Sequence, residues 1–369
     1  MLLTLHAGAL RSRLQGFGTT AAARMKLTDI PALARGELGV TGMILSSDLL
    51  AGADRPMLQR VLEAADKAGC PILVLMESTM HALGSSDIGV VERSTERCLR
   101  VAQAAHWLGC SAFSLPLSGA DDEETLQNMA ANLKPISRRA EKLDLNLCIA
   151  PQPGLTSTPE RVAEVLKKIG GFRVGTLPDF GAAAAADPVQ YLRRLVPYAS
   201  AVLVPASEYG LDPAAAKAPE EPAAAAKKSR PSTKSKGDVR DDPKPEVKTT
   251  AKPRLTKPKK STRAEVDEAV KKMGSHTAAP RGGAGSGDYD LVKFAQVLEA
   301  VGYEGPITLD YRGTGDPLPA LIRARDIVIK TLSAPAAADD SGLSALLAAV
   351  EGDVDELDEP EEDGAKLDE

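Results

Sequence analysis

The sequence is poor in aromatic residues, cysteine, histidine and long apolar runs. Phe, Tyr and Trp make up only 3% of its 369 residues, so a hydrophobic core must consist mainly of Ala, Leu, Val and Ile. The four cysteines lack CxxC spacing, which argues against a zinc site and favours buried thiols in a reducing compartment. No apolar run approaches the roughly 18 residues of a membrane-spanning helix. We therefore expect a cytoplasmic protein with no membrane contact.

Charge is concentrated in two segments of low complexity. Residues 211–281 contain 18 Lys and Arg against 10 Asp and Glu, whereas residues 335–369 contain one Lys against 13 acidic residues. Neither segment has enough large apolar side chains to offset the entropy that folding costs. We predict a disordered Ala/Lys/Pro-rich basic insertion over 207–284 and an acidic low-complexity tail over 335–369.

The role of the basic insertion stays open on sequence alone. It could bind a polyanion or a protein partner; without interleaved aromatic residues, binding to nucleic acid would be nonspecific and sensitive to salt. It could instead be masked by the acidic tail, or be a solvated linker with no partner. The sequence does not indicate an oligomeric state.

The remaining chain alternates short apolar runs with amphipathic helical segments. Eight strand-like runs follow one another without hairpin pairing, which predicts parallel strands joined by crossover helices and closed into a (β/α)₈ barrel. Residues 1–206 and 285–334, 256 in all, match the length of about 250 residues that is typical of this fold. The expected strands are 2–6, 41–46, 71–76, 111–117, 145–150, 174–177, 199–204 and 306–310.

A strand–helix–strand unit over 145–181 is the best-defined part of this pattern. The helix is expected to begin at an N-cap, Ser157 or Thr158, followed by Pro159, and to end at Gly170. The second strand leads directly to Asp179. Because α/β folds place their chemistry at the carboxyl ends of strands, Asp179 is the first candidate for a functional residue.

Several blocks resemble the xylose isomerase-like sugar phosphate isomerase/epimerase barrels. They are GLTSTPERVAEVL, GTLPDFG, DPVQYLRRLVPYASAV and YDLVKFAQVLEAVGYEGPITLDYRG, in the order and spacing of that family. The resemblance implies four metal-ligating side chains at the ends of late strands and proton transfer beside a sugar carbonyl. Carboxylates and a histidine suit Mn²⁺, Mg²⁺, Co²⁺ or Zn²⁺ in such a site.

By this resemblance, two of the four metal-ligand positions retain a carboxylate. Asp179 stands at the position of a family Asp, and Asp310 replaces a family Glu with a side chain one methylene shorter. Ala150 and Leu203 stand at the positions of a Glu and a His, so those two ligands are lost. Two carboxylates alone would hold a hard cation weakly.

Two further positions, which we expect to bind substrate, also depart from the family pattern. Gln152 stands where the family usually has a His, and Arg312 stands where it has an acid. We expect Arg312 to pair with Asp179 or Asp310, so that a salt bridge takes the place of the metal charge. Pro205 stands at the position of a family Lys.

His6 and Glu77 complete the set of candidate catalytic residues. They lie at the ends of the first and third predicted strands, where they could face the mouth of the barrel together with Asp179 and Asp310. They could instead be structural residues, because a solitary His near a strand end is more often structural than functional.

The leading hypothesis is a sugar phosphate isomerase/epimerase-like barrel whose metal site is degenerate. It would bind a small sugar or polyol, or act as a scaffold, without a cofactor. One alternative is an active divalent-metal-dependent isomerase/epimerase with a rearranged site. A third hypothesis is an interaction protein that acts through its charged segments.

Overall fold

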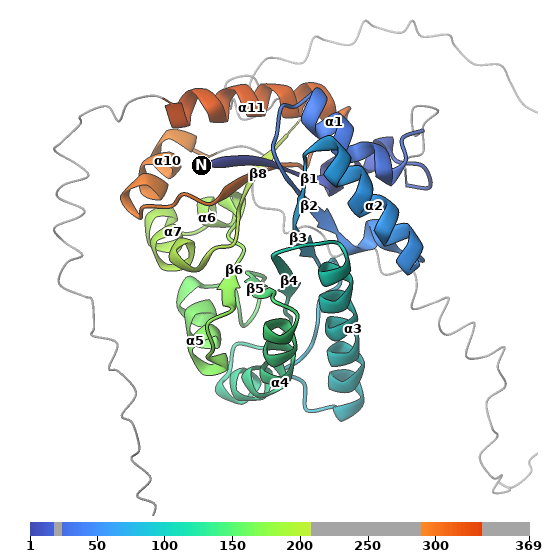
Figure 1. The fold of residues 1–369 in the computed structure, drawn as a ribbon. Coiled ribbons are helices and arrows are strands. Elements are labelled where there is room, and N and C mark those ends of the chain that lie inside the picture. Colours follow the sequence, from blue (N-terminus) through green and yellow to red (C-terminus); the bar gives the residue numbers. More distant parts are fainter. Residues whose placement is uncertain (18–23, 208–288, 334–369) are drawn as a thin grey trace, which may run out of the picture.

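Eight parallel strands form the centre of the protein, and the helices surround them (Figure 1). The computed structural model describes residues 1–17, 24–207 and 289–333. The hydrogen-bonded order is β6-β5-β4-β3-β2-β1-β8-β7. This is the TIM-barrel fold, which confirms the expected fold class. The strands are β1 (Leu2–His6), β2 (Met43–Ser46), β3 (Ile72–Met76), β4 (Ala112–Pro116), β5 (Asn146–Ala150), β6 (Val174–Thr176), β7 (Val202–Ala206) and β8 (Pro306–Tyr311).

The helices begin where the sequence places capping side chains. Asp54, Asp122 and Thr158 each accept a hydrogen bond from a backbone N–H in the first turn of their helix, which satisfies a donor that the helix itself leaves unpaired. The predicted cap at Thr158 is thereby confirmed. The helices are α1 (Ile30–Gly36), α2 (Arg55–Ala68), α3 (Ile88–Trp107), α4 (Glu123–Lys142), α5 (Pro159–Ile169), α6 (Phe180–Ala184), α7 (Pro188–Leu195), α10 (Leu291–Ala300) and α11 (Pro317–Ser333).

β6 and β7 are the two end strands of the hydrogen-bonded order and have no ladder between them. Two isolated parallel bridges, Thr176–Ala199 and Asp179–Leu203, join these strands in place of a continuous ladder. Gly175 lies so close to the turn before β7 that a Cβ atom there would come within 2.4 Å of the Tyr198 carbonyl oxygen. The close approach at this seam therefore requires glycine.

The strands are buried on both faces, as the parallel sheet of a TIM barrel requires. Their outward side chains join the helices in one large core. A second, smaller cluster fills the inside of the barrel and consists of Ile44, Val74, Ala112, Cys148, Leu177, Ala201 and Leu203. Leu, Val, Ile and Ala make up most of both clusters, as the low aromatic content predicted.

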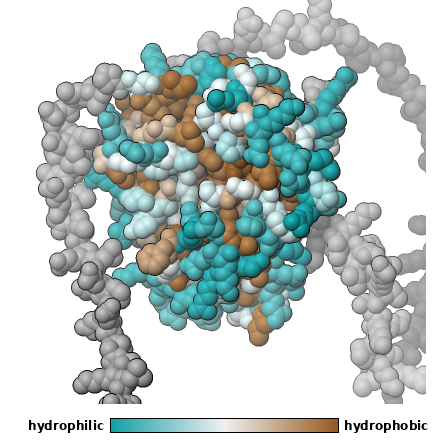
Figure 2. All heavy atoms as spheres, in the orientation of Figure 1, coloured by the Kyte–Doolittle hydropathy of each residue, from teal (hydrophilic) through white to brown (hydrophobic). Residues whose placement is uncertain are grey.

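The outer surface is mixed in character. On the face shown in Figure 2, hydrophilic residues cover most of the region of α3 and α4, and hydrophobic ones gather toward α10 and α11. Val292 of α10 and Ile329 of α11 are both about half exposed. Within the described residues, no helix combines the length and the apolar character that crossing a membrane would need.

The predicted strands agree with the observed ones to within two residues at each end, except at the start of β7. β7 begins at Val202 rather than at Ala199, because the Ala199 N–H donates to the Val196 carbonyl and the Ser200 N–H donates to the Thr176 carbonyl across the seam. The short helix α6 was not predicted. The basic insertion and the acidic tail fall almost entirely outside the described residues. The chain leaves the described part just after β7 and re-enters it at Tyr289.

Candidate functional site

Arg312 connects the ends of two strands at the carboxyl end of the barrel. It lies just after β8, and its Nε donates to Asp310 Oδ2 at 2.9 Å. Its Nη2 donates to Asp179 Oδ2, and its Nη1 lies 3.4 Å from Asp179 Oδ1. The expected pairing of Arg312 with Asp179 or Asp310 therefore occurs with both. Burial alone would lower the pKa of Arg312, but the two carboxylates raise it overall, so the guanidinium stays charged.

Asp179 has a second role at the start of α6. Its Oδ1 accepts hydrogen bonds from the backbone N–H groups of Gly181 at 2.7 Å and Ala182 at 3.2 Å. The side chain is thus the N-cap of α6 and a partner of Arg312 at the same time. Both oxygens of the carboxylate are engaged by donors of this chain, one chiefly by backbone amides and one by the guanidinium.

His6 links Asp310 to a serine that the sequence analysis did not single out. His6 Nδ1 lies 2.6 Å from Asp310 Oδ1, and His6 Nε2 lies 2.6 Å from Ser46 Oγ. All three side chains are at least 98% buried. A continuous chain of hydrogen bonds therefore runs from Ser46 of β2 through His6 of β1 to Asp310 of β8, and then through Arg312 to Asp179.

Three aromatic rings support this site from the helix side. Phe180, next to Asp179, meets Tyr289 and Phe294 edge to face, and the last two rings stack at 5.3 Å. The Tyr289 hydroxyl donates to the Pro205 carbonyl at 2.8 Å. Burial, together with the nearby charge of Asp179, raises the pKa of Tyr289, so this hydroxyl keeps its proton. The cluster therefore connects the segment that begins at Tyr289 to the end of β7.

The remaining positions taken from the family resemblance also lie at the strand ends. Leu203 is 6% exposed and belongs to the apolar cluster inside the barrel, and its backbone pairs with Asp179. Ala150 is the last residue of β5 and is half-buried. Gln152 lies two residues after Ala150 and is also half-buried. Its backbone N–H donates to Thr156 Oγ1 at 3.1 Å.

Glu77 lies apart from these residues. Its neighbour Met76 pairs with Ser114 of β4 inside the barrel, so the alternation along the strand turns Glu77 outward. There its carboxylate forms a 3.0 Å ion pair with Arg97 of α3 and accepts from the Thr79 backbone N–H. Burial lowers the pKa of His81 nearby, although the charge of Glu77 opposes this shift. The contacts of Glu77 are those of a residue that anchors a helix to the barrel.

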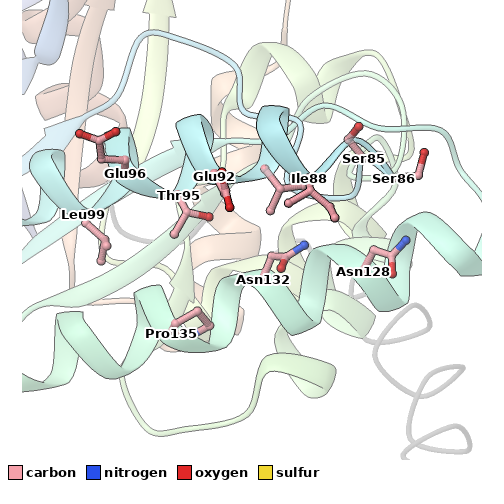
Figure 3. Close-up of a pocket in the computed structure, with 11 residues that line it drawn as sticks. Ser85, Ser86, Ile88, Glu92, Thr95, Glu96, Leu99, Asn128, Asn132 and Pro135 are labelled. Atoms are coloured by element: carbon pink, nitrogen blue, oxygen red, sulfur yellow. The ribbon is translucent and has the colours of Figure 1, made fainter.

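A groove on the outer layer is separate from the strand ends. It lies between α3 and α4 and encloses about 690 Å³. Figure 3 shows Ile88, Glu92 and Leu99 facing Asn132 and Pro135 across it. Its lining contains none of the candidate residues named from the sequence.

The chemical capacity of the barrel mouth follows from these contacts. Arg312, Asp179 and Gln152 are partly exposed and can donate to or accept from the hydroxyl groups of a ligand. Within residues 1–17, 24–207 and 289–333, no group of three or more His, Cys, Asp or Glu side chains is disposed to hold a metal ion. Asp179 and Asp310 are the two carboxylates that the family resemblance placed at metal-ligand positions. Both form ion pairs with Arg312.

The ring of parallel strands, with polar side chains gathered at their carboxyl ends, defines a TIM barrel. The chain belongs to the xylose isomerase-like TIM barrel family, whose model matches residues 36–223. This is a family of sugar epimerase- and isomerase-like barrels. The resemblance noted from the sequence is confirmed.

Solved structures agree with this assignment. The chain is similar to an L-ribulose 3-epimerase, with 13% identity and a TM-score of 0.60 over 96% of this chain and 99% of that one. It is similar to a D-psicose 3-epimerase at 11% identity and TM-score 0.57, and to a 3-keto-D-glucoside 4-epimerase from E. coli at 12% and 0.56, each over 90% of this chain and all of the other. At such identities the likeness shows the fold alone. No curated protein matches the chain.

Sequence reasoning missed Ser46 and Arg97. Ser46 ends the second predicted strand, so its position at a carboxyl end was available as an indication. Arg97 gave no comparable indication, because its contact with Glu77 depends on which face of β3 is turned outward.

Proposed function

We propose that the protein is a sugar phosphate isomerase/epimerase-like barrel with a degenerate metal site, and that it binds a small sugar or polyol without isomerising it. One observation carries the proposal. All four oxygens of Asp179 and Asp310 already accept a hydrogen bond from a group of this chain. The positive charge between the two carboxylates is the guanidinium of Arg312.

A divalent cation does not fit this set of donors. Hard cations need several oxygen ligands with negative charge, and here the two carboxylates are neutralised in part by Arg312. A cation brought to the same place would also be repelled by the guanidinium at short range. Ala150 and Leu203 supply no ligand atom from their side chains. For these reasons no catalytic step through a metal is assigned to this site.

The residues that remain are suited to hold a neutral, hydroxyl-rich molecule. An arginine–carboxylate pair offers donors and acceptors side by side, which matches adjacent hydroxyl groups, and Gln152 adds both kinds of atom. Arg312 is 18% exposed and Asp179 is 16% exposed, so part of each faces the mouth.

The alternative of an active isomerase with a rearranged site is favoured by one contact, the 2.6 Å hydrogen bond between His6 and Asp310. A histidine held by a carboxylate can act as a general base. The two functions differ in turnover and in their need for a metal, so one set of experiments separates them.

The test is binding of free sugars, sugar phosphates and polyols to the full-length protein by calorimetry, with EDTA or with Mn²⁺. Samples are followed by NMR for isomerised product. We expect at least one compound to bind equally in both conditions without conversion, and Gln152→Ala to weaken binding about tenfold, or 1.4 kcal/mol. Arg325→Met, on the outer helix α11, is the matched control and should not change the affinity. Conversion that depends on Mn²⁺ would establish the active isomerase instead, and absence of both binding and conversion would contradict the proposal.

A further inference from the structure

We propose that Ser46 is a nucleophile activated by His6 and positioned through Asp310, which would give the barrel a second activity toward small carboxylic esters. This activity is independent of sugar binding. It rests on the hydrogen bond between His6 and Ser46, which the proposed function does not use.

The order of contacts is that of a nucleophile, a base and an orienting carboxylate. Asp310 Oδ1 meets His6 Nδ1 at 2.6 Å, and His6 Nε2 meets Ser46 Oγ at 2.6 Å. A carboxylate has only acceptor atoms, so the bond to Asp310 places a proton on Nδ1. In the neutral tautomer with this proton, Nε2 carries a lone pair that can accept the Ser46 hydroxyl proton. This arrangement polarises the O–H bond of Ser46.

The backbone holds these three residues firmly. They lie at the carboxyl ends of β8, β1 and β2, which are adjacent and directly hydrogen-bonded in the sheet. Asp310 is fixed from its other side by Arg312 at 2.9 Å. Sites built on strands keep their geometry better than sites built on loops.

The hydroxyl of Ser46 does not make the helix-capping hydrogen bond that is common for a serine at this position. Ser46 is the N-cap of a 3₁₀ helix over Ser47–Leu50, and a serine there commonly caps the backbone. Here the side chain makes no cap hydrogen bond. It turns to His6 instead, which a purely local structural role does not explain.

A second hydroxyl, that of Ser114, lies on the inner wall of the barrel near Ser46. Ser46 pairs with Met76, and Met76 pairs with Ser114 of β4, so the two serines share one row of the wall. Ile44 and Ala112, two residues earlier on the same strands, belong to the inner cluster, so both serines point inward. Ser114 Oγ is fully buried and has no hydrogen-bond partner among the described residues. Buried hydroxyl groups without a partner are uncommon, and a bound molecule would supply one.

The reaction follows directly from this geometry. As Ser46 Oγ bonds to the carbonyl carbon of an ester, its proton passes to His6 Nε2. The bond between that carbon and the alcohol oxygen then breaks, and the leaving alkoxide takes the proton from His6. Water hydrolyses the acyl-serine in a second step, with His6 again accepting and returning a proton, which restores the free hydroxyl. Because Ser46 is 1% exposed, only small esters would reach it.

The test is covalent labelling of the full-length protein with diisopropyl fluorophosphate, a small reagent for activated serines. The labelled site is identified by peptide mass spectrometry. We expect one adduct at Ser46 and a burst of p-nitrophenol from p-nitrophenyl acetate. Both should be lost in Ser46→Ala. In His6→Gln the labelling rate should fall at least about 100-fold, the usual lower contribution of a general base.

Ser111→Ala is the control, because Ser111 lies just before β4, away from the carboxyl ends of the strands, and its hydroxyl bonds to the Leu73 carbonyl. This variant should be labelled at the wild-type rate. Circular dichroism checks that each variant is folded. Folded wild-type protein without an adduct at Ser46 would overturn the proposal, and so would labelling of Ser46 at the same rate in folded His6→Gln. Either result would show a structural hydrogen-bond chain only and would leave the sugar-binding proposal untouched.

Discussion

Arg312 donates to Asp179 across the seam between β6 and β7, from a position 133 residues further along the chain. Because Arg312 also holds Asp310, a single guanidinium joins the ends of β6 and β8. Isolated bridges take the place of a strand ladder at this seam, so the side-chain link reinforces a part of the wall that has few backbone hydrogen bonds between strands.

Replacing Arg312 should destabilise the protein strongly. Arg312→Met leaves two carboxylates buried without their cation, which we expect to cost about 3–5 kcal/mol in the free energy of unfolding. In Arg312→Met/Asp179→Asn the loss should be smaller than the sum of the two single losses, because Asn still caps α6 and carries no charge. Urea denaturation of the four proteins measures this. Additive losses would show that the two side chains are not energetically coupled.

The Tyr289 hydroxyl should contribute measurably to stability. In Tyr289→Phe the Pro205 carbonyl loses a buried partner at 2.8 Å, while the ring contacts with Phe180 and Phe294 remain. We expect a loss of about 1–2 kcal/mol by urea denaturation. Tyr198→Phe, at a half-exposed tyrosine, is the control and should change little. Equal effects in both variants would argue against a role of Tyr289 in anchoring α10 to β7.

The cysteine thiols should be unreactive in the folded protein. Burial raises the pKa of Cys70 and Cys148 to about 11 and of Cys98 to about 12, and it raises that of Cys110 as well. At neutral pH at most roughly one thiol in ten thousand is therefore ionised, and it is also shielded from reagents. Titration with Ellman's reagent should find none reacting promptly in native protein and all four in denaturant. A thiol that reacts rapidly in native protein would contradict this account.

The ion pair between Arg13 and Asp316 should make a small contribution to stability that depends on pH. The hydrogen bond from Arg13, at 2.8–2.9 Å, lowers the pKa of Asp316 below its unfolded value. The stabilisation is therefore complete above the unfolded carboxyl pKa and is lost as pH falls through the lower folded pKa. Because Asp316 is half exposed, we expect at most about 1 kcal/mol.

Urea denaturation of Asp316→Asn tests this, with Asp66→Asn as the control because Asp66 is an exposed residue of α2. The difference between wild type and Asp316→Asn should be present at neutral pH, weaken in high salt and disappear in acid. A difference that grows in acid would reverse the sign of the argument.

The sequence predicted the barrel well because its local patterns agree with the fold. Apolar runs bounded by Gly and Pro mark the strands, and caps such as Thr158 mark the helix starts. The pairing of Arg312 with Asp179 or Asp310 could be predicted because all three residues stand at strand ends. The five-residue helix α6 was missed because its alanine-rich run, Ala182–Ala186, has no polar face and hence no helical period.

The side-chain contacts between neighbouring strands could not be predicted from the sequence. β3 is apolar on both faces, so its pattern does not show that Met76 points inward and Glu77 outward. Likewise the link between His6 and Ser46 depends on the register between β1 and β2, in which His6 pairs with Ile44 and not with Ser46. Register in a parallel sheet is set by packing of the whole barrel, and no short motif encodes it.

The central claim, that Arg312 has taken the place of a metal ion, is tested most directly by metal content. Full-length protein is incubated with Mn²⁺, Mg²⁺, Co²⁺ and Zn²⁺, desalted and analysed by inductively coupled plasma mass spectrometry, with Asp179→Asn treated alongside. The account predicts far less than one metal ion per chain in both proteins, because each carboxylate already has a cationic partner. Close to one ion per chain in the wild type, lost in Asp179→Asn, would contradict it.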